Sequence, residues 1–104
     1  MGIVEQMEAK WDEMGAVKKE RGILFEDFEA NKEKIAELYY EGEILKLQYM
    51  FLKRQQLAEA DRTFPVVAES IDSVSSINET CISALQKRLI KDGFEERLRR
   101  ERLI

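Results

Sequence analysis

The chain has 104 residues with no histidine and a single cysteine, and its 21 acidic and 17 basic side chains give a net charge of −4. Without histidine it lacks the imidazole base of serine–histidine and cysteine–histidine relays, and also the commonest metal ligand. One cysteine can neither form an intramolecular disulfide nor complete a zinc site. We therefore predict a protein that is not an enzyme, with no catalytic residue, cofactor or metal ion.

The composition favours long helices. Ala, Glu, Lys, Leu and Arg account for 51 of the 104 residues, which is typical of helical bundles and coiled coils. The length suits one domain. We predict an all-α fold over residues 1–104, either a long antiparallel helical hairpin or a three-helix bundle, with coiled-coil-like packing.

The first predicted helix covers residues 2–20 and the second covers residues 23–61. Steps of four and three residues, taken alternately from Ile3 to Leu52, pass through fifteen positions, and eleven of these are apolar. We call these fifteen positions the apolar stripe. Gly15 and Gly22 each cost about 1 kcal/mol inside a helix and favour a kink near residues 15–22. Without a break, the two helices would join into one helix of about 60 residues.

The middle of the second helix is unusually apolar, with ten apolar residues among the fifteen from Leu38 to Leu52. These point in more directions than one stripe can hold, so the segment needs cover on several sides. We predict a homo-oligomer, a dimer or larger, that associates through residues 35–57. In the alternative, the first helix folds back as the third member of a monomeric bundle. The predicted interface residues are Ile35, Leu38, Gly42, Leu45, Tyr49, Leu52 and Trp11.

Two of the stripe positions depart from the apolar pattern. Gly42 lies among bulky neighbours, where the missing side chain would admit a second helix at close range. Asn31 is polar at a core position and is predicted to fix register or oligomer state.

A turn is predicted at residues 62–64, where Thr63 can cap the next helix and Pro65 can occupy its first turn. The third helix then covers residues 65–91, with Cys81 buried in its apolar face. Gly93 is predicted to end it with a left-handed cap. A charged tail, residues 94–104, follows as a short helical piece or a frayed end.

Charge is graded from an acidic start to a basic end, with a sum of −6 over residues 1–44 and +3 over residues 87–104. If the tail continues the antiparallel pairing, it meets residues 23–33, which are rich in acids. It can then dock on Glu26, Asp27, Glu29 and Glu33. The candidate contacts to an anionic partner are Arg97, Arg99, Arg100 and Arg102.

These patterns together predict a non-enzymatic helical protein–protein interaction module, a scaffold, adaptor or regulator that self-associates through its central helix. The alternative is a small nucleic-acid-associated regulator that uses the basic C-terminal stretch. Residues 1–10 lack the apolar run of a signal peptide, and no stretch approaches the roughly 20 apolar residues of a membrane helix. We therefore expect a cytoplasmic protein whose partner is another protein and not a membrane.

Overall fold

The computed structural model describes the backbone of residues 2–63 and 68–104, and the side-chain surroundings of residues 2–59 and 79–104. In this part of the chain the elements are the helices α1 (Ile3–Leu24), α2 (Phe28–Thr63), α3 (Ala68–Lys91) and α4 (Glu95–Arg100), with a 3₁₀ turn, η1 (Phe25–Asp27), between α1 and α2. No strand occurs among these residues. The predicted all-α fold is confirmed.

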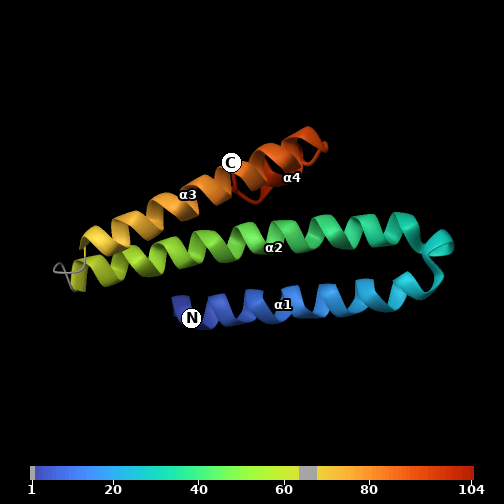
Figure 1. The fold of residues 1–104 in the computed structure, drawn as a ribbon, viewed down its shortest axis with the longest axis horizontal. Coiled ribbons are helices and arrows are strands. Elements are labelled where there is room, and N and C mark those ends of the chain that lie inside the picture. The colour runs from blue at the N-terminus through green and yellow to red at the C-terminus, as the bar shows by residue number, and fades with distance from the viewer. Residues whose placement is uncertain (1, 64–67) are drawn as a thin grey trace.

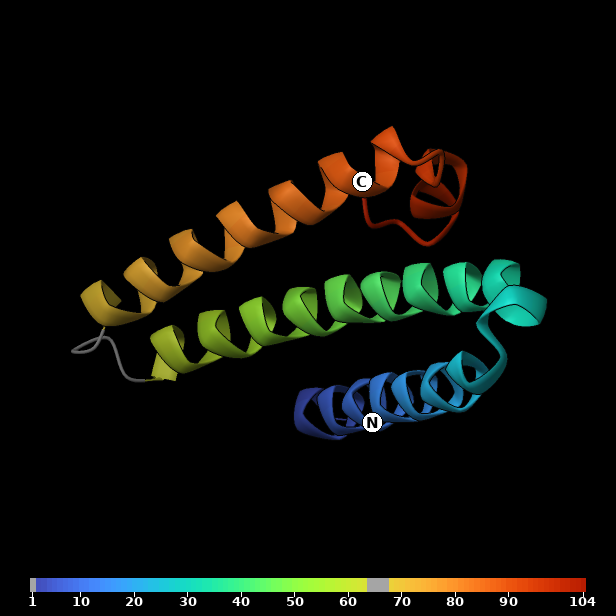
Figure 2. The same ribbon diagram turned by 45° about the vertical axis from the view of Figure 1, so that its right-hand side comes forward.

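The helix α2 is the central element of the molecule. As Figure 1 shows, α1 and α3 lie on opposite sides of α2, and both run antiparallel to it. Figure 2 shows α3 diverging from α2 toward its C-terminal end, where α4 folds back between them. The molecule is 54 Å long with a radius of gyration of 16.0 Å, against about 13 Å for a typical domain of this length. The arrangement is an elongated bundle in which α1 is the third long helix.

The connection between α1 and α2 lies at residues 25–27, so the kink predicted near residues 15–22 is wrong. Gly15 and Gly22 lie inside a continuous helix. The chain turns instead where polar side chains satisfy the helix ends. The Asp27 carboxylate accepts a hydrogen bond from the Ala30 backbone N–H (3.4 Å), and the Asn31 side chain donates one to the Leu24 carbonyl (3.3 Å). Asn31 thus caps the end of α1.

The predicted apolar stripe forms the contact between α1 and α2. After the turn at residues 25–27, its two halves face each other across the pair of helices. Met7, Ile35, Leu38 and Leu45 are buried in this contact, with at most 9% of each residue exposed. Every stripe position is buried or half-buried except Phe28, which lies at the turn.

A second core lies between α2, α3 and α4. Its buried members come from all three helices and from the chain end. Tyr40, Met50, Phe51, Leu85 and Phe94 are half-buried and pack around them. The buried set is Ile44, Leu47, Ile82, Leu89, Leu98 and Leu103. The apolar residues of the central segment thus divide between two neighbours, α1 on one side and α3 with α4 on the other.

The buried face of α3 differs by one residue from the predicted one. Cys81 is exposed, so its predicted burial is wrong; Ile82, which is 3% exposed, points into the core instead. The helix α2 extends to Thr63, two residues beyond the predicted end. The predicted turn at 62–64 and the first turn at Pro65 reach into residues 64–67, which lie outside the described residues.

Gly93 ends α3 with a positive φ of 88°, as predicted. The Gly93 N–H donates to the Ile90 carbonyl (3.0 Å) and the Phe94 N–H donates to the Leu89 carbonyl (2.9 Å), which is a Schellman motif. This cap reverses the chain, so the tail forms α4 and folds back on the bundle.

Candidate interaction surfaces

The predicted interface along α2 is largely covered within the chain. Ile35, Leu38 and Leu45 lie beneath α1, and Leu52 is half-buried. Gly42 also faces α1, since a Cβ atom added there would lie 3.7 Å from Cγ1 of Val17. The close approach at Gly42 is therefore made by α1 of the same chain.

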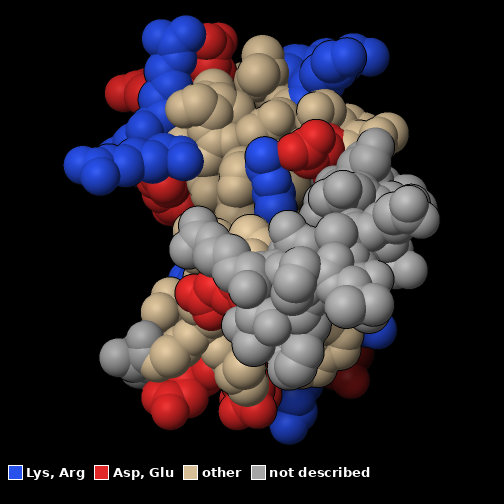
Figure 3. Space-filling model, turned by 90° about the vertical axis from the view of Figure 1, so that its left-hand side faces the viewer, with Lys and Arg blue, Asp and Glu red and all other residues tan. Residues whose placement is uncertain are grey.

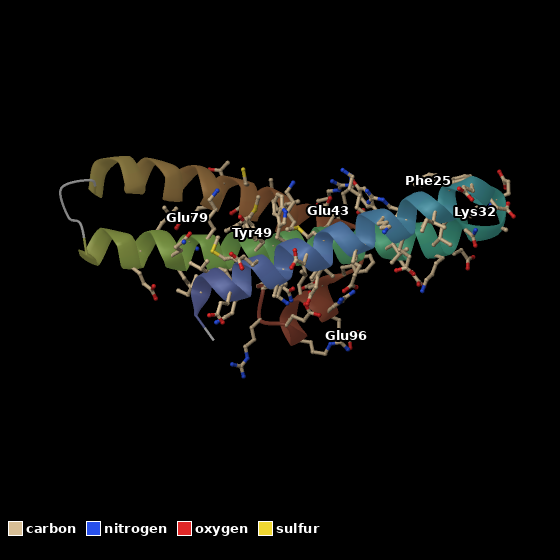
Figure 4. All side chains as sticks on the ribbon, turned by 90° about the horizontal axis from the view of Figure 1, so that it is seen from below. Phe25, Lys32, Glu43, Tyr49, Glu79 and Glu96 are labelled. Carbon is tan, nitrogen blue, oxygen red and sulfur yellow. The ribbon has the colours of Figure 1, made fainter. Side chains whose placement is uncertain are left out.

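Trp11 and Tyr49 form the part of the predicted interface that remains accessible. Their ring centroids lie 5.6 Å apart at an interplanar angle of 51°. Trp11 is 63% exposed, the highest exposure of any large apolar residue in the described part of the chain. Figure 4 shows Tyr49 beside α1. Two of the residues predicted for the interface, which belong to different helices, are thus in contact in the structure.

An open groove of about 290 Å³ runs beside this aromatic pair. Its walls come from the first half of α1 and from the facing flank of α2. The lining residues are Val4, Met7, Glu8, Trp11, Asp12, Tyr49 and Gln56. Met7 forms the buried floor, whereas Val4 is 54% exposed at the edge. The groove can accept an apolar side chain from another helix.

A second apolar surface lies at the α1–α2 connection and was missed by the sequence analysis. The rings of Phe25 and Phe28 stack with centroids 5.8 Å apart, and both residues are about half exposed. They border a groove of about 520 Å³ flanked by Arg21 and Lys32. Figure 4 shows Phe25 and Lys32 together at this end of the molecule. Phe28 falls on the apolar stripe, but it lies at the start of α2 and is exposed.

Charged side chains pack around Tyr39 and Tyr40 where α2 meets α3. Arg88 donates a hydrogen bond to the Tyr39 hydroxyl, and its guanidinium lies 5.0 Å from the Tyr39 ring centroid. The Arg21 guanidinium lies 5.4 Å from the same ring. A hydrogen bond to the Asp92 carboxylate raises the pKa of Tyr40. These contacts connect α1, α2 and the C-terminal end of α3.

The basic tail docks on α2 at a different place from the predicted one. Arg97 forms a two-bond ion pair with Glu41, with its closest N–O distance at 2.6 Å, and a further pair with Glu101 at 3.2 Å. Gln48 donates to Glu101 across 2.9 Å. The predicted docking on residues 26–33 is wrong, because the reversal at Gly93 carries the tail back along α2.

The tail arginines are consequently unequal as contacts for an anionic partner. Arg97 is engaged with Glu41 and Glu101, and Arg99 pairs with Glu95 in its own helix. Arg100 and Arg102 are exposed and have no ion pair in the described part of the chain. In the end-on view of Figure 3, basic side chains project from the upper part of the molecule with acidic side chains among them, and further acidic side chains lie at the lower end.

No group of three or more histidine, cysteine or carboxylate side chains is placed to bind a metal ion in the described residues. Among those same residues, no helix is at once long and apolar enough to cross a bilayer. The chain shows no significant similarity to any known family model, curated protein or solved structure.

Proposed function

We propose that this chain is a non-enzymatic helical interaction module that self-associates through the side of the bundle bearing Trp11 and Tyr49. The observation that carries the proposal is the exposed Trp11 beside an open groove. A tryptophan buries about 150–250 Å² when covered, and each Å² of apolar surface removed from water contributes about 25 cal/mol. Because 63% of Trp11 is still exposed, covering it on two copies contributes on the order of 5–8 kcal/mol toward association.

The central helix takes part in this contact through its flank. Tyr49 and Gln56 belong to α2 and line the groove with Trp11. The buried apolar residues of α2 pack against α1, α3 or α4, so they stabilise the protomer. In this proposal, one face of α2 forms the core of the protomer and another flank of α2 contributes to the association surface.

Two copies of the same surface suit each other because each presents an exposed aromatic ring with open space beside it. Closed two-fold pairing is the commonest form of self-association, and it uses one patch on both subunits. Tryptophan is also enriched among the residues that dominate the energy of protein interfaces.

Light scattering after size exclusion, over about three decades of protein concentration, tests the proposal. We expect the mass to rise from the monomer value of 12.2 kDa to twice that value. Trp11→Ala should weaken this association, whereas Phe28→Ala, which removes an exposed ring at the other end of the same helix pair, should leave it unchanged. A monomeric mass at every concentration would refute the proposal.

The nucleic-acid alternative stays a prediction with weaker support. Two of its four arginines, Arg97 and Arg99, already have carboxylate partners within the chain. Salt-dependent retardation of labelled DNA or RNA would test it, since phosphate contacts weaken steeply with added salt.

A further inference from the structure

The exposed flank of α1 that bears Trp11 carries a second stripe at helical spacing, displaced by one residue, or about 100° around the helix, from the apolar stripe that faces α2. Its six positions follow one another in steps of four and three residues, and all six are exposed. They are Val4, Glu8, Trp11, Gly15, Lys18 and Gly22. We name these six residues the outer stripe.

We infer that two copies of the chain pair through the outer stripe, with their α1 helices antiparallel about a two-fold axis midway between Trp11 and Gly15. The inference rests on the proposed self-association and specifies its geometry. In this register Trp11 lies over the partner's Gly15 and Glu8 faces the partner's Lys18. Val4 meets the partner's Gly22 at each end.

The charges on the outer stripe favour this orientation. Glu8 and Lys18 are exposed and form no ion pair among the described residues. Antiparallel pairing places the two opposite charges together twice, once on each side of the axis. On the flank it also brings Glu5 near the partner's Lys19. Parallel pairing would set Glu8 against the partner's Glu8, which is repulsive.

Stabilisation of α1 itself does not account for these two charges. The helix dipole favours acidic residues in the first turn and basic residues in the last turn, and the effect fades beyond them. Glu5 and Arg21 occupy those turns. Glu8 and Lys18 lie further inside the helix, where their charges can complement those of a partner.

The shape of the outer stripe is complementary as well. Trp11, Met14, Gly15 and Lys18 line a shallow recess of about 340 Å³ on α1. A Cβ atom added at Gly15 would meet no other atom within 4 Å, so space stands open beside the helix backbone. On each copy the bulkiest residue of the stripe is therefore opposed by a position with no side chain.

Charge reversal tests the pairing, with analytical ultracentrifugation as the readout. Glu8→Lys alone sets like charges against the partner's Lys18, and Lys18→Glu alone does the same against the partner's Glu8. Each variant should raise the dimer dissociation constant about tenfold or more. An equimolar mixture of the two single variants should dimerise as tightly as the wild type, because every facing pair is then of opposite sign.

Glu20→Lys and Lys34→Glu are matched controls, since they make the same charge changes at exposed positions outside the stripe. Circular dichroism should show that all four variants retain the wild-type helix content. Trp11 is the sole tryptophan, so its emission should shift to shorter wavelength as the wild type dimerises.

The outcomes separate the two proposals. A wild type that dimerises while both single variants dimerise equally well, with no gain on mixing, would overturn the outer-stripe pairing and leave self-association standing. A wild type that stays monomeric throughout would overturn both. Recovery of dimer only in the mixture supports both.

Discussion

Arg102 has a strained backbone conformation, and the contacts of neighbouring residues offset the cost of this strain. It is the non-glycine residue of the described chain with positive φ (59°), a conformation that costs about 1–2 kcal/mol for a residue with a Cβ atom. The Leu103 N–H donates to the Leu98 carbonyl at 2.8 Å, which closes a second Schellman motif after α4. Burial of Leu98 and Leu103 holds the strained turn in place.

We therefore expect Arg102→Gly to raise the free energy of unfolding by about 0.5–1 kcal/mol, since glycine adopts positive φ without steric cost. Urea denaturation at low protein concentration measures this. Arg102→Ala is the matched control, because it removes the same charge and keeps the Cβ atom. Equal stability of the two variants would contradict the assigned strain.

Gly42 allows a second prediction at the scale of one residue. Gly42→Ala should stabilise the protein by up to about 1 kcal/mol, because alanine favours helix and its Cβ would make an ordinary 3.7 Å contact with Val17. Gly42→Leu should destabilise it by about 1–3 kcal/mol, since the longer side chain overfills the α1–α2 contact. Both follow from denaturation curves.

Gly22 provides the comparison, because a Cβ atom there would have no neighbour within 4 Å. Gly22→Ala and Gly22→Leu should both be tolerated. If leucine at position 42 were as well tolerated as at position 22, α1 would not lie against Gly42.

At the scale of the elements, α4 and the residues after it are held to α2 by the Arg97–Glu41 ion pair, by the Gln48–Glu101 hydrogen bond and by the burial of Leu98 and Leu103. The pKa of Glu41 is lowered, first by its hydrogen bond from Arg97 and further by the positive charges of Arg97 and Lys10, while partial burial opposes the shift. A lowered folded-state pKa means that ionised Glu41 stabilises the fold above its unfolded value of about 4.5. That contribution is lost as pH falls through the folded-state pKa.

Glu41→Gln should therefore lower the melting temperature at neutral pH and have a smaller effect in acid, where the wild-type carboxyl is protonated. The loss should stay below about 1 kcal/mol, because the pair is partly exposed. Glu37→Gln removes the same charge one turn away on an exposed position and should change little. Thermal melts from neutral to acidic pH compare the two, and equal, pH-independent effects would contradict the role of the Arg97 contact.

The sequence predicted the helices better than the places where the chain turns. The apolar stripe and the Gly93 cap depend on spacing and on backbone sterics, which a single sequence records. The prediction of a kink was wrong because a glycine costs only about 1 kcal/mol in a helix, and the packing of α1 on α2 outweighs this cost. The predicted docking place of the tail was wrong because it assumed that the tail continues in the direction of α3, whereas the chain reverses at Gly93.

Trp11 and Tyr49 were recognisable in the sequence because both were candidates for the interface, and the structure brings them together. Phe25 and the partners of Arg97 were not recognisable, since their positions depend on where two reversals fall. Local pattern fixes which face of a helix is apolar, but the angle at each turn decides which residues from distant parts of the chain meet.

On the scale of the whole molecule, α1 has two separate duties. Its inner face covers the apolar stripe of α2, and its exposed flank presents Trp11. A change confined to the outer stripe should therefore alter association without weakening the protomer. Gly15 is the position where these two effects are expected to have opposite signs.

Gly15→Leu should raise the unfolding free energy of the dilute protein by about 0.5–1 kcal/mol, because leucine favours helix and its Cβ atom would have no neighbouring atom within 4 Å. The same change should weaken dimer formation, since the new side chain fills the space that receives the partner's Trp11. Ala16→Leu is the control, as it enlarges the next exposed residue outside the outer stripe and should leave dimerisation unchanged. Denaturation at low concentration and sedimentation at high concentration measure the two effects separately. Undiminished dimerisation of the Gly15 variant would show that the contact between copies does not cross the middle of α1.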